Sequence, residues 1–150
     1  MPHRKLKALI IDDEAAILEE LKWHLEQHSW EVATASDGVR GKECCEQSSE
    51  QFDLIVSDIR MPGIDGQTLL KTVAQSKKDL LPALFVMTAY DDVLREDAHA
   101  IGADAVFQKP FRVKELIAAA QHFIKVRNDF TAEATTKNAI RPASGPIKVQ

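Results

Sequence analysis

Residues 6–14 read LKALIIDDE, a largely apolar run that ends abruptly in three acidic residues. A short run of this kind is typical of a strand buried on both faces of a parallel sheet, with the carboxylates at its carboxyl end. Four further apolar runs follow, at residues 30–35, 52–57, 82–87 and 105–108. Three of these runs lead into polar residues, which are Asp58, Thr88 and Lys109. The recurrence of polar residues at strand ends predicts one shared ligand-binding edge.

Stretches with helical spacing of apolar residues separate the runs. They cover residues 14–28, 38–49, a segment around 69–73, residues 91–101, and a last segment from about residue 112. Five βα units in this order predict a doubly wound α/β fold, with a five-stranded parallel sheet and helices on both faces. We expect one domain over residues 1–126. From residue 127 the pattern stops, and residues 127–150 are predicted to form a flexible C-terminal tail or linker.

Composition narrows the class of protein. The 150 residues are 45% hydrophobic and 28% charged, with a formal net charge of −4, which disfavours general nucleic-acid binding. No apolar stretch approaches the roughly 20 residues of a membrane span, so we expect a cytoplasmic protein that binds no membrane. The two cysteines, Cys44 and Cys45, are adjacent and have no zinc-ligand spacing.

The predicted edge gathers three carboxylates, from Asp12, Asp13 and Asp58. Like charges at one place repel, and a divalent cation relieves the repulsion; ligands that are all oxygen suit Mg²⁺. A carboxylate beside Mg²⁺ is suited to attack a phosphoryl group, whose remaining oxygens suit the Thr88 hydroxyl and the Lys109 ammonium. Each residue taken alone has a simpler explanation, since Asp12-Asp13 is also a common helix cap and Thr88 a strand-end hydroxyl.

Four motifs carry a resemblance to a known family. They are residues 9–14 (LIIDDE), 57–66 (SDIRMPGIDG), 87–89 (MTA) and 109–111 (KPF). In this order and spacing they resemble the receiver domain of two-component response regulators, over about residues 5–126. The resemblance implies the flavodoxin-like (βα)5 receiver fold.

The resemblance also implies a metal site. Asp58 would be the phosphoacceptor and one of the Mg²⁺ ligands. Asp13 would bind the ion directly, Asp12 would act mainly through a bound water, and the backbone carbonyl of Arg60 would complete the set.

Further roles follow for the phosphoryl group and for the switch. Thr88 would bind the phosphoryl group after its transfer to Asp58, Lys109 would pair with it, and the Lys109-Pro110 bond would be cis. The surface of the fourth helix, fifth strand and fifth helix would then change.

Partners follow from the same resemblance. The phosphoryl donor would be a phosphohistidine on a histidine kinase or a histidine phosphotransfer protein, and a downstream protein target would recognise the changed surface. The chain would be no enzyme for external substrates, because it assists only its own phosphorylation and dephosphorylation. A single-domain regulator, a relay shuttle or a receiver cut from a longer protein all fit, as a monomer or as a phosphorylation-dependent dimer.

Two departures leave alternatives open. Val106 stands where the family usually has an aromatic residue, and strand alternation places Phe107 on the opposite face. The alternative function is therefore a receiver-like protein-binding module that does not switch. A Mg²⁺-dependent phosphatase is disfavoured, because such enzymes need a second carboxylate two residues after the nucleophile, where Arg60 stands.

Overall fold

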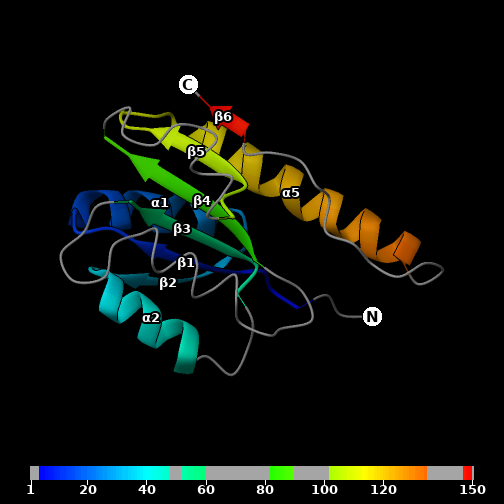
Figure 1. Ribbon diagram of the computed structural model, residues 1–150, viewed down its shortest axis with the longest axis horizontal. Helices are drawn as coiled ribbons and strands as arrows, with labels where there is room; N and C mark the ends of the chain where they lie inside the picture. The colour runs from blue at the N-terminus through cyan, green and yellow to red at the C-terminus, as the bar shows by residue number, and fades with distance from the viewer. Residues whose placement is uncertain (1–3, 48–51, 60–81, 90–101, 135–146, 150) are drawn as a thin grey trace.

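The computed structural model describes residues 4–47, 52–59, 82–89, 102–134 and 147–149 (Figure 1). The strands are β1 (Lys7–Ile11), β2 (Glu31–Ala35), β3 (Leu54–Asp58), β4 (Ala83–Thr88), β5 (Ala105–Gln108) and β6 (Ile147–Val149). The helices are α1 (Ala15–Gln27), α2 (Gly38–Gln47) and α5 (Val113–Ala134). The predicted helices around residues 69–73 and 91–101 lie outside the described residues.

The strands form one parallel sheet in the order β2-β1-β3-β4-β5-β6. The five predicted strands are all present, and their order reverses direction after β2, which requires crossovers on both faces. Parallel strands point their carboxyl ends the same way, so residues 12, 58, 88 and 109 come to one edge. The predicted doubly wound α/β fold is confirmed.

Side chains alternate between two cores because successive residues of a strand face opposite sides. On one face, Ile10, Val56, Phe85 and Phe107 pack with α1 and α5. On the other face, Leu9, Ile11, Ile55 and Val86 pack toward α2. Figure 1 shows α1 and α5 on one side of the sheet and α2 on the other.

Helix α2 approaches the sheet closely at Gly41. A Cβ atom at this position would lie 2.5 Å from Cδ1 of Ile11, which is fully buried in the last position of β1. Glycine therefore allows the helix to lie directly over the strand that leads to Asp12.

Regular structure continues past residue 127, within the segment predicted to be a flexible C-terminal tail or linker. Helix α5 continues to Ala134, and β6 adds a sixth strand beside β5. Arg127, at the predicted boundary, lies within α5 and donates a hydrogen bond from Nη2 to Oδ1 of Asp53 at 2.8 Å. This buried ion pair supports the helix where apolar periodicity had ended. The division of the chain into domain and tail stays a prediction.

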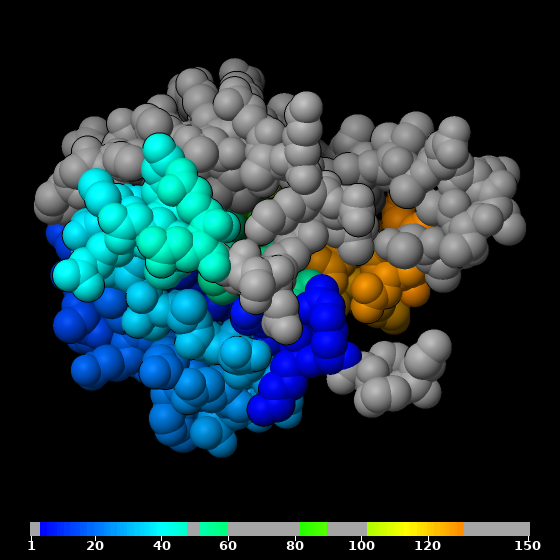
Figure 2. Space-filling view, turned by 90° about the horizontal axis from the view of Figure 1, so that it is seen from below, coloured from blue at the N-terminus to red at the C-terminus, as the bar shows by residue number. Residues whose placement is uncertain are grey.

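Asp53 also binds the start of the described chain. Arg4 donates two hydrogen bonds of 2.7 Å to its two carboxylate oxygens, and the amide of Lys7 donates one of 2.9 Å. Figure 2, seen from below, shows the dark-blue start of the described chain beside the orange α5. Asp53 thus joins three segments at the amino end of the sheet. None of the helices in the described part of the chain has the length and apolar character that a membrane crossing needs.

Candidate functional site

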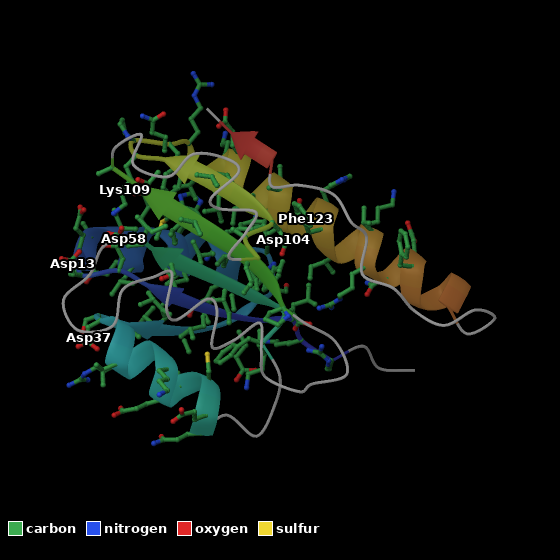
Figure 3. All side chains as sticks on the ribbon, in the orientation of Figure 1. Asp13, Asp37, Asp58, Asp104, Lys109 and Phe123 are labelled. Carbon is green, nitrogen blue, oxygen red and sulfur yellow. The ribbon has the colours of Figure 1, made fainter. Side chains whose placement is uncertain are left out.

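Four strands bring the predicted site residues to the carboxyl edge of the sheet. Asp12 directly follows β1, Asp58 is the last residue of β3, Thr88 ends β4, and Lys109 directly follows β5. Figure 3 shows Asp13, Asp58 and Lys109 at this same end of the molecule. Residues almost a hundred positions apart therefore share one site, because their strands are parallel neighbours or near neighbours.

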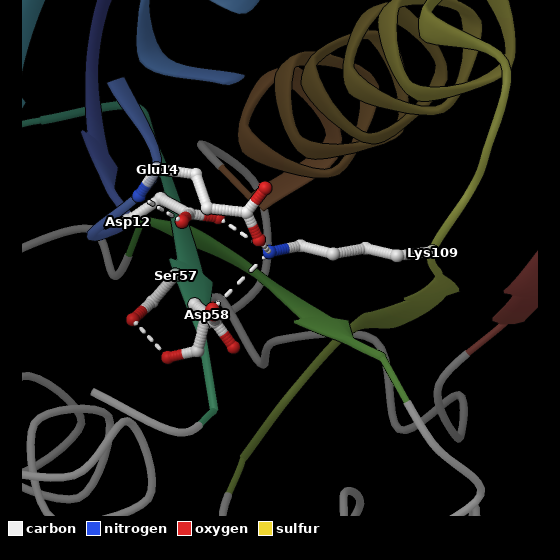
Figure 4. Close-up of polar contacts among 5 residues, drawn as sticks. All are labelled: Asp12, Glu14, Ser57, Asp58 and Lys109. Carbon is white, nitrogen blue, oxygen red and sulfur yellow. Dashed lines mark hydrogen bonds and ion pairs between the residues drawn. The ribbon is translucent and has the colours of Figure 1, made fainter. Parts of the chain in front are cut away.

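Lys109 lies at the centre of the contacts. Its Nζ donates hydrogen bonds to Oδ2 of Asp12 at 2.8 Å, to Oδ2 of Asp58 at 3.1 Å, and to Oε1 of Glu14 at 3.2 Å (Figure 4). One ammonium group is thus shared by three carboxylates. The Lys109 amide also donates to the Thr88 carbonyl at 2.7 Å, which couples the end of β5 to the end of β4.

Burial and charge act in opposite directions on the pKa values of these groups. Burial raises the pKa of Asp12 above its ordinary value, and the hydrogen bond from Lys109 only partly offsets this effect. For Lys109, burial lowers the pKa, but the ion pairs with Asp12 and Asp58 outweigh it and raise the pKa well above the ordinary value. The lysine is therefore charged throughout the physiological pH range.

The three predicted carboxylates form a compact group. One oxygen each from Asp12, Asp13 and Asp58 lies within 4.8 Å of the other two. Asp12 is fully buried and Asp58 nearly so, whereas Asp13 is exposed. Within the described part of the chain, the Lys109 ammonium does not balance this much negative charge, and an all-oxygen donor set suits a hard divalent cation. The cluster therefore fits Mg²⁺.

The local backbone holds the carboxylates in place. Oδ1 of Asp12 accepts a hydrogen bond from the Glu14 amide at 2.8 Å, while the Asp12 amide donates to the Ala35 carbonyl at 3.1 Å. The hydroxyl of Ser57 donates to the backbone carbonyl of Asp58 at 2.9 Å. The N-cap residue of α1 is Glu14, with no side-chain capping hydrogen bond, so Asp13 does not serve as its cap.

Glu14 is the site residue that sequence reasoning missed. It was the last acidic residue of the opening motif but had no predicted role, and the structure brings its carboxylate to Lys109. The sequence did indicate this position, because Glu14 directly follows the Asp12-Asp13 pair that was predicted to lie at this edge. The predicted ligand Arg60 lies outside the described residues.

The remaining predictions concern Thr88 and the strand before Lys109. Thr88 is buried at the site's edge, and the following Ala89 is exposed. The Lys109-Pro110 bond is cis, as the resemblance implied. Val106 packs in the core that faces α2, and Phe107 packs in the opposite core with α1 and α5. The expected separation of these two residues is therefore confirmed.

Comparison with known proteins gives consistent matches. The family model described as response regulator receiver domain matches residues 8–121. The chain is 33% identical over 133 residues to the alkaline phosphatase synthesis transcriptional regulatory protein PhoP of Bacillus subtilis, covering 86% of this chain and 52% of the relative. It is 34% identical to the probable transcriptional regulator ycf27 of Guillardia theta, covering 91% and 53% of the two chains. The chain thus spans about half the length of these curated relatives.

Solved structures agree with the family match. A CheY-like receiver domain protein from Methanospirillum hungatei has a TM-score of 0.75 at 26% identity, covering 84% of this chain and 98% of that one. The chemotaxis response regulator CheY4 of Vibrio cholerae has a TM-score of 0.71 at 26% identity, covering 79% and 98%. With the family model matching most of the chain, this protein belongs to the response regulator receiver domain family.

Proposed function

We propose that this receiver domain accepts a phosphoryl group on Asp58 from a phosphohistidine donor, in a reaction that depends on Mg²⁺. The observation that carries the proposal is the convergence of Asp12, Asp13 and Asp58 at the carboxyl edge of the sheet, where the half-buried Lys109 donates to Asp12 and Asp58. Asp58 ends a strand whose residues are all buried, so its carboxylate is held at a defined place.

The transfer needs one bond to form and one to break. An oxygen of the Asp58 carboxylate forms a bond to phosphorus while the bond between phosphorus and the donor imidazole nitrogen breaks. The electron pair of the broken bond leaves with the imidazole, and the phosphoryl group becomes an acyl phosphate on Asp58. The protein contributes mainly position and charge to such a reaction.

Mg²⁺ would be held by Asp12, Asp13 and Asp58, with the backbone carbonyl of Arg60 as a further proposed ligand. When bound, the ion neutralises negative charge on the transferring phosphoryl group. Asp12 accepts a hydrogen bond from the Glu14 amide and Asp58 ends a buried strand, so two of the three carboxylates are preorganised.

Lys109 and Thr88 would bind the oxygens of the transferred phosphoryl group. Lys109 already bridges Asp12 and Asp58, and its amide donates to the Thr88 carbonyl, so a movement of Thr88 toward the phosphoryl group would also displace Lys109. We propose that this movement alters the surface of the fourth helix, β5 and α5, which a downstream protein reads. In this scheme the protein turns over no external substrate.

Three arrangements of the whole protein are compatible with this chemistry, because the chain spans about half the length of its curated relatives. The names of those relatives describe transcriptional regulators. A receiver that belongs to a longer protein, a single-domain regulator and a relay shuttle all need the same acceptor chemistry. Phosphoryl donors would be histidine kinases or histidine phosphotransfer proteins in each case.

The test is intact mass after incubation with phosphoramidate, with and without Mg²⁺. We expect the wild type to gain one phosphoryl group only with Mg²⁺, and Asp58→Asn to gain none. Asp37→Asn is the matched control, because Asp37 lies at the same edge but caps α2 through the Arg40 amide at 2.8 Å (Figure 3). An unmodified wild type, with the control protein folded, would contradict the proposal.

A second candidate is a binding module that keeps the fold without switching. The observation in its favour is that Val106 occupies the position of the usual aromatic residue, while Phe107 is committed to the other core. The same mass measurement separates the two functions. A folded wild type that gains no phosphoryl group in the presence of Mg²⁺ would favour this second candidate.

A further inference from the structure

The two outermost of the five predicted strands, β2 and β5, differ in character. Strand β2 forms one edge and exposes Glu31 and Thr34, so it carries a charge and polar groups toward solvent. Strand β5 has the sequence AVFQ, with Ala105, Val106 and Phe107 buried and no charged residue. An uncovered apolar edge strand without charge or proline is a template for pairing with another strand. The β5 edge therefore needs a cover, and the β2 edge does not.

The chain itself supplies that cover. Strand β6 pairs with β5 in parallel, with Ala105 opposite Ile147, Val106 opposite Lys148, and Phe107 opposite Val149. On its other side, β5 pairs with β4 over all four of its residues. Gln108 is the one residue of β5 without a partner in β6, so the pairing with β6 does not reach Lys109.

We propose that the outer edge of β5 is a strand-docking surface, filled by residues 147–149 of the same chain and open to the same segment of a second copy. The docked strand has three residues, so it forms few hydrogen bonds and opens at little cost. Twelve residues, 135–146, separate it from α5 and span at most about 40 Å when stretched. That reach allows the segment to be exchanged between neighbouring copies, a route to dimers that needs no new contact.

A second copy of this chain is the expected partner for a chemical reason. Backbone pairing gives affinity to any extended strand, whereas alternate side chains decide which strand fits. The sequence Ile147-Lys148-Val149 is apolar, basic and apolar, and it already has a defined register on β5. An identical segment from another molecule has the same register, and β5 presents no charge to repel it.

The docking surface is separate from the phosphoryl site. The paired residues end at Phe107, and Phe107 packs on the face opposite to Val106, within the core of α1 and α5. In the absence of a phosphoryl donor, strand exchange should therefore occur equally in the wild type and in Asp58→Asn. A failure of the proposed phosphoryl transfer would leave this inference untouched, and the reverse also holds.

The experiment uses the full chain labelled with ¹⁵N, in which Lys148 and Val149 are both replaced by proline. Successive N–H groups of a strand point to opposite edges, so two adjacent prolines remove at least one that faces β5. The backbone amide signals of residues 105–107 then report the open edge. Lys148→Gln with Val149→Thr is the matched control, because it keeps both N–H groups.

Two unlabelled probes are added to the labelled proline variant. The first is a synthetic peptide of residues 143–150, and the second is the unlabelled full chain. We expect both to shift the signals of residues 105–107, and the unlabelled proline variant to shift none. The peptide should bind the proline variant at least tenfold more tightly than the wild type, whose own segment competes at an effective concentration on the order of millimolar.

Each outcome supports or overturns a defined part of the inference. Shifts with the peptide and with the wild-type chain, but not with the proline variant, support the inference. Shifts with the peptide alone would overturn the second copy as the occupant. No shift with either probe, or equal peptide affinity for wild type and proline variant, would overturn the docking surface itself. The dispersed spectrum of the labelled chain shows whether the variant is folded, and the control variant should behave like the wild type.

Discussion

Two clusters of buried aspartate lie at opposite ends of the same sheet, and their charge balance differs. At the carboxyl end, Asp12 and Asp58 share one ammonium from Lys109 with the exposed Glu14. At the amino end, the single carboxylate of Asp53 is bound by two guanidinium groups, from Arg4 and Arg127. Among the residues that the structure describes, the first cluster has an excess of negative charge and the second an excess of positive charge.

The pKa values of the two buried aspartates reflect this difference. Burial opposes ionisation at both, but at Asp53 the hydrogen bonds from Arg4, the Lys7 amide and Arg127 outweigh burial and lower the pKa. At Asp12 burial prevails and the pKa is raised. A balanced cluster stabilises the fold by itself, whereas an unbalanced one needs a ligand of opposite charge. Buried carboxylates gathered in excess of the described cations thus indicate a functional site.

The largest effect is expected from removing Asp53. Asp53→Ala leaves the guanidinium of Arg127, whose side chain is 17% exposed, without its carboxylate. Breaking a buried ion pair in this way costs about 3 kcal/mol of unfolding free energy. Asp58→Ala should cost far less, because it relieves repulsion at the other cluster. Urea unfolding of both variants checks the contrast, and equal losses would abolish the distinction between the clusters.

The pH dependence of stability should have opposite signs at the two aspartates. The folded pKa of Asp53 lies below its unfolded value near 3.8, so its contribution is present above that value and is lost as pH falls through the folded pKa. The folded pKa of Asp12 lies above its unfolded value, so Asp12 destabilises at neutral pH and the penalty is relieved as pH falls through that raised pKa.

Unfolding measurements between pH 3 and pH 7, roughly the carboxylate range, test this expectation in two variants. In Asp53→Asn, less stability should be lost as the pH falls to the acid end of this range. In Asp12→Asn, the gain in stability that begins as the pH falls through the raised pKa of Asp12 should be absent. A tenfold difference in proton affinity between folded and unfolded chains corresponds to about 1.4 kcal/mol. Identical pH profiles for both variants would show that the two carboxylates sit in equivalent environments.

Mg²⁺ should stabilise the wild type through the unbalanced cluster alone. At a concentration about ten times its dissociation constant, a ligand that binds only the folded state adds about 1.4 kcal/mol. We expect this gain in Asp53→Asn as well, and a much smaller one in Asp13→Asn, which keeps the buried carboxylates. Thermal unfolding with and without Mg²⁺ measures it; an undiminished gain in Asp13→Asn would place the ion elsewhere.

The smallest effect is expected at Glu14. Its side chain is 59% exposed, and its contact with Lys109 at 3.2 Å is the longest of the three. An exposed ion pair of this kind contributes about 0.5 kcal/mol or less. Glu14→Gln should therefore change stability slightly and weaken Mg²⁺ binding by no more than about twofold. Isothermal titration decides this, and a loss as large as that of Asp13→Asn would make Glu14 a full member of the site.

Much of this architecture was predictable because local patterns and the sheet agree. The five apolar runs became the five strands, and the polar residues after them met at one edge because parallel strands share their direction. The end of the domain was less predictable. Residues 127–134 have no clear apolar stripe, and their helix is supported by the distant Asp53, a partner that local periodicity does not reveal. The roles of Asp58, Thr88 and Lys109 in phosphoryl transfer stay predictions.

The sequence by itself determined the order of the first five strands along the chain and the residue types at their ends, since periodicity and composition are local properties. The tertiary structure decided which charges face one another. It placed Glu14 on Lys109, Asp53 between Arg4 and Arg127, and β6 on the edge of β5. These pairings join segments far apart in the chain, and their energies depend on burial and distance, which exist only once the sheet has formed.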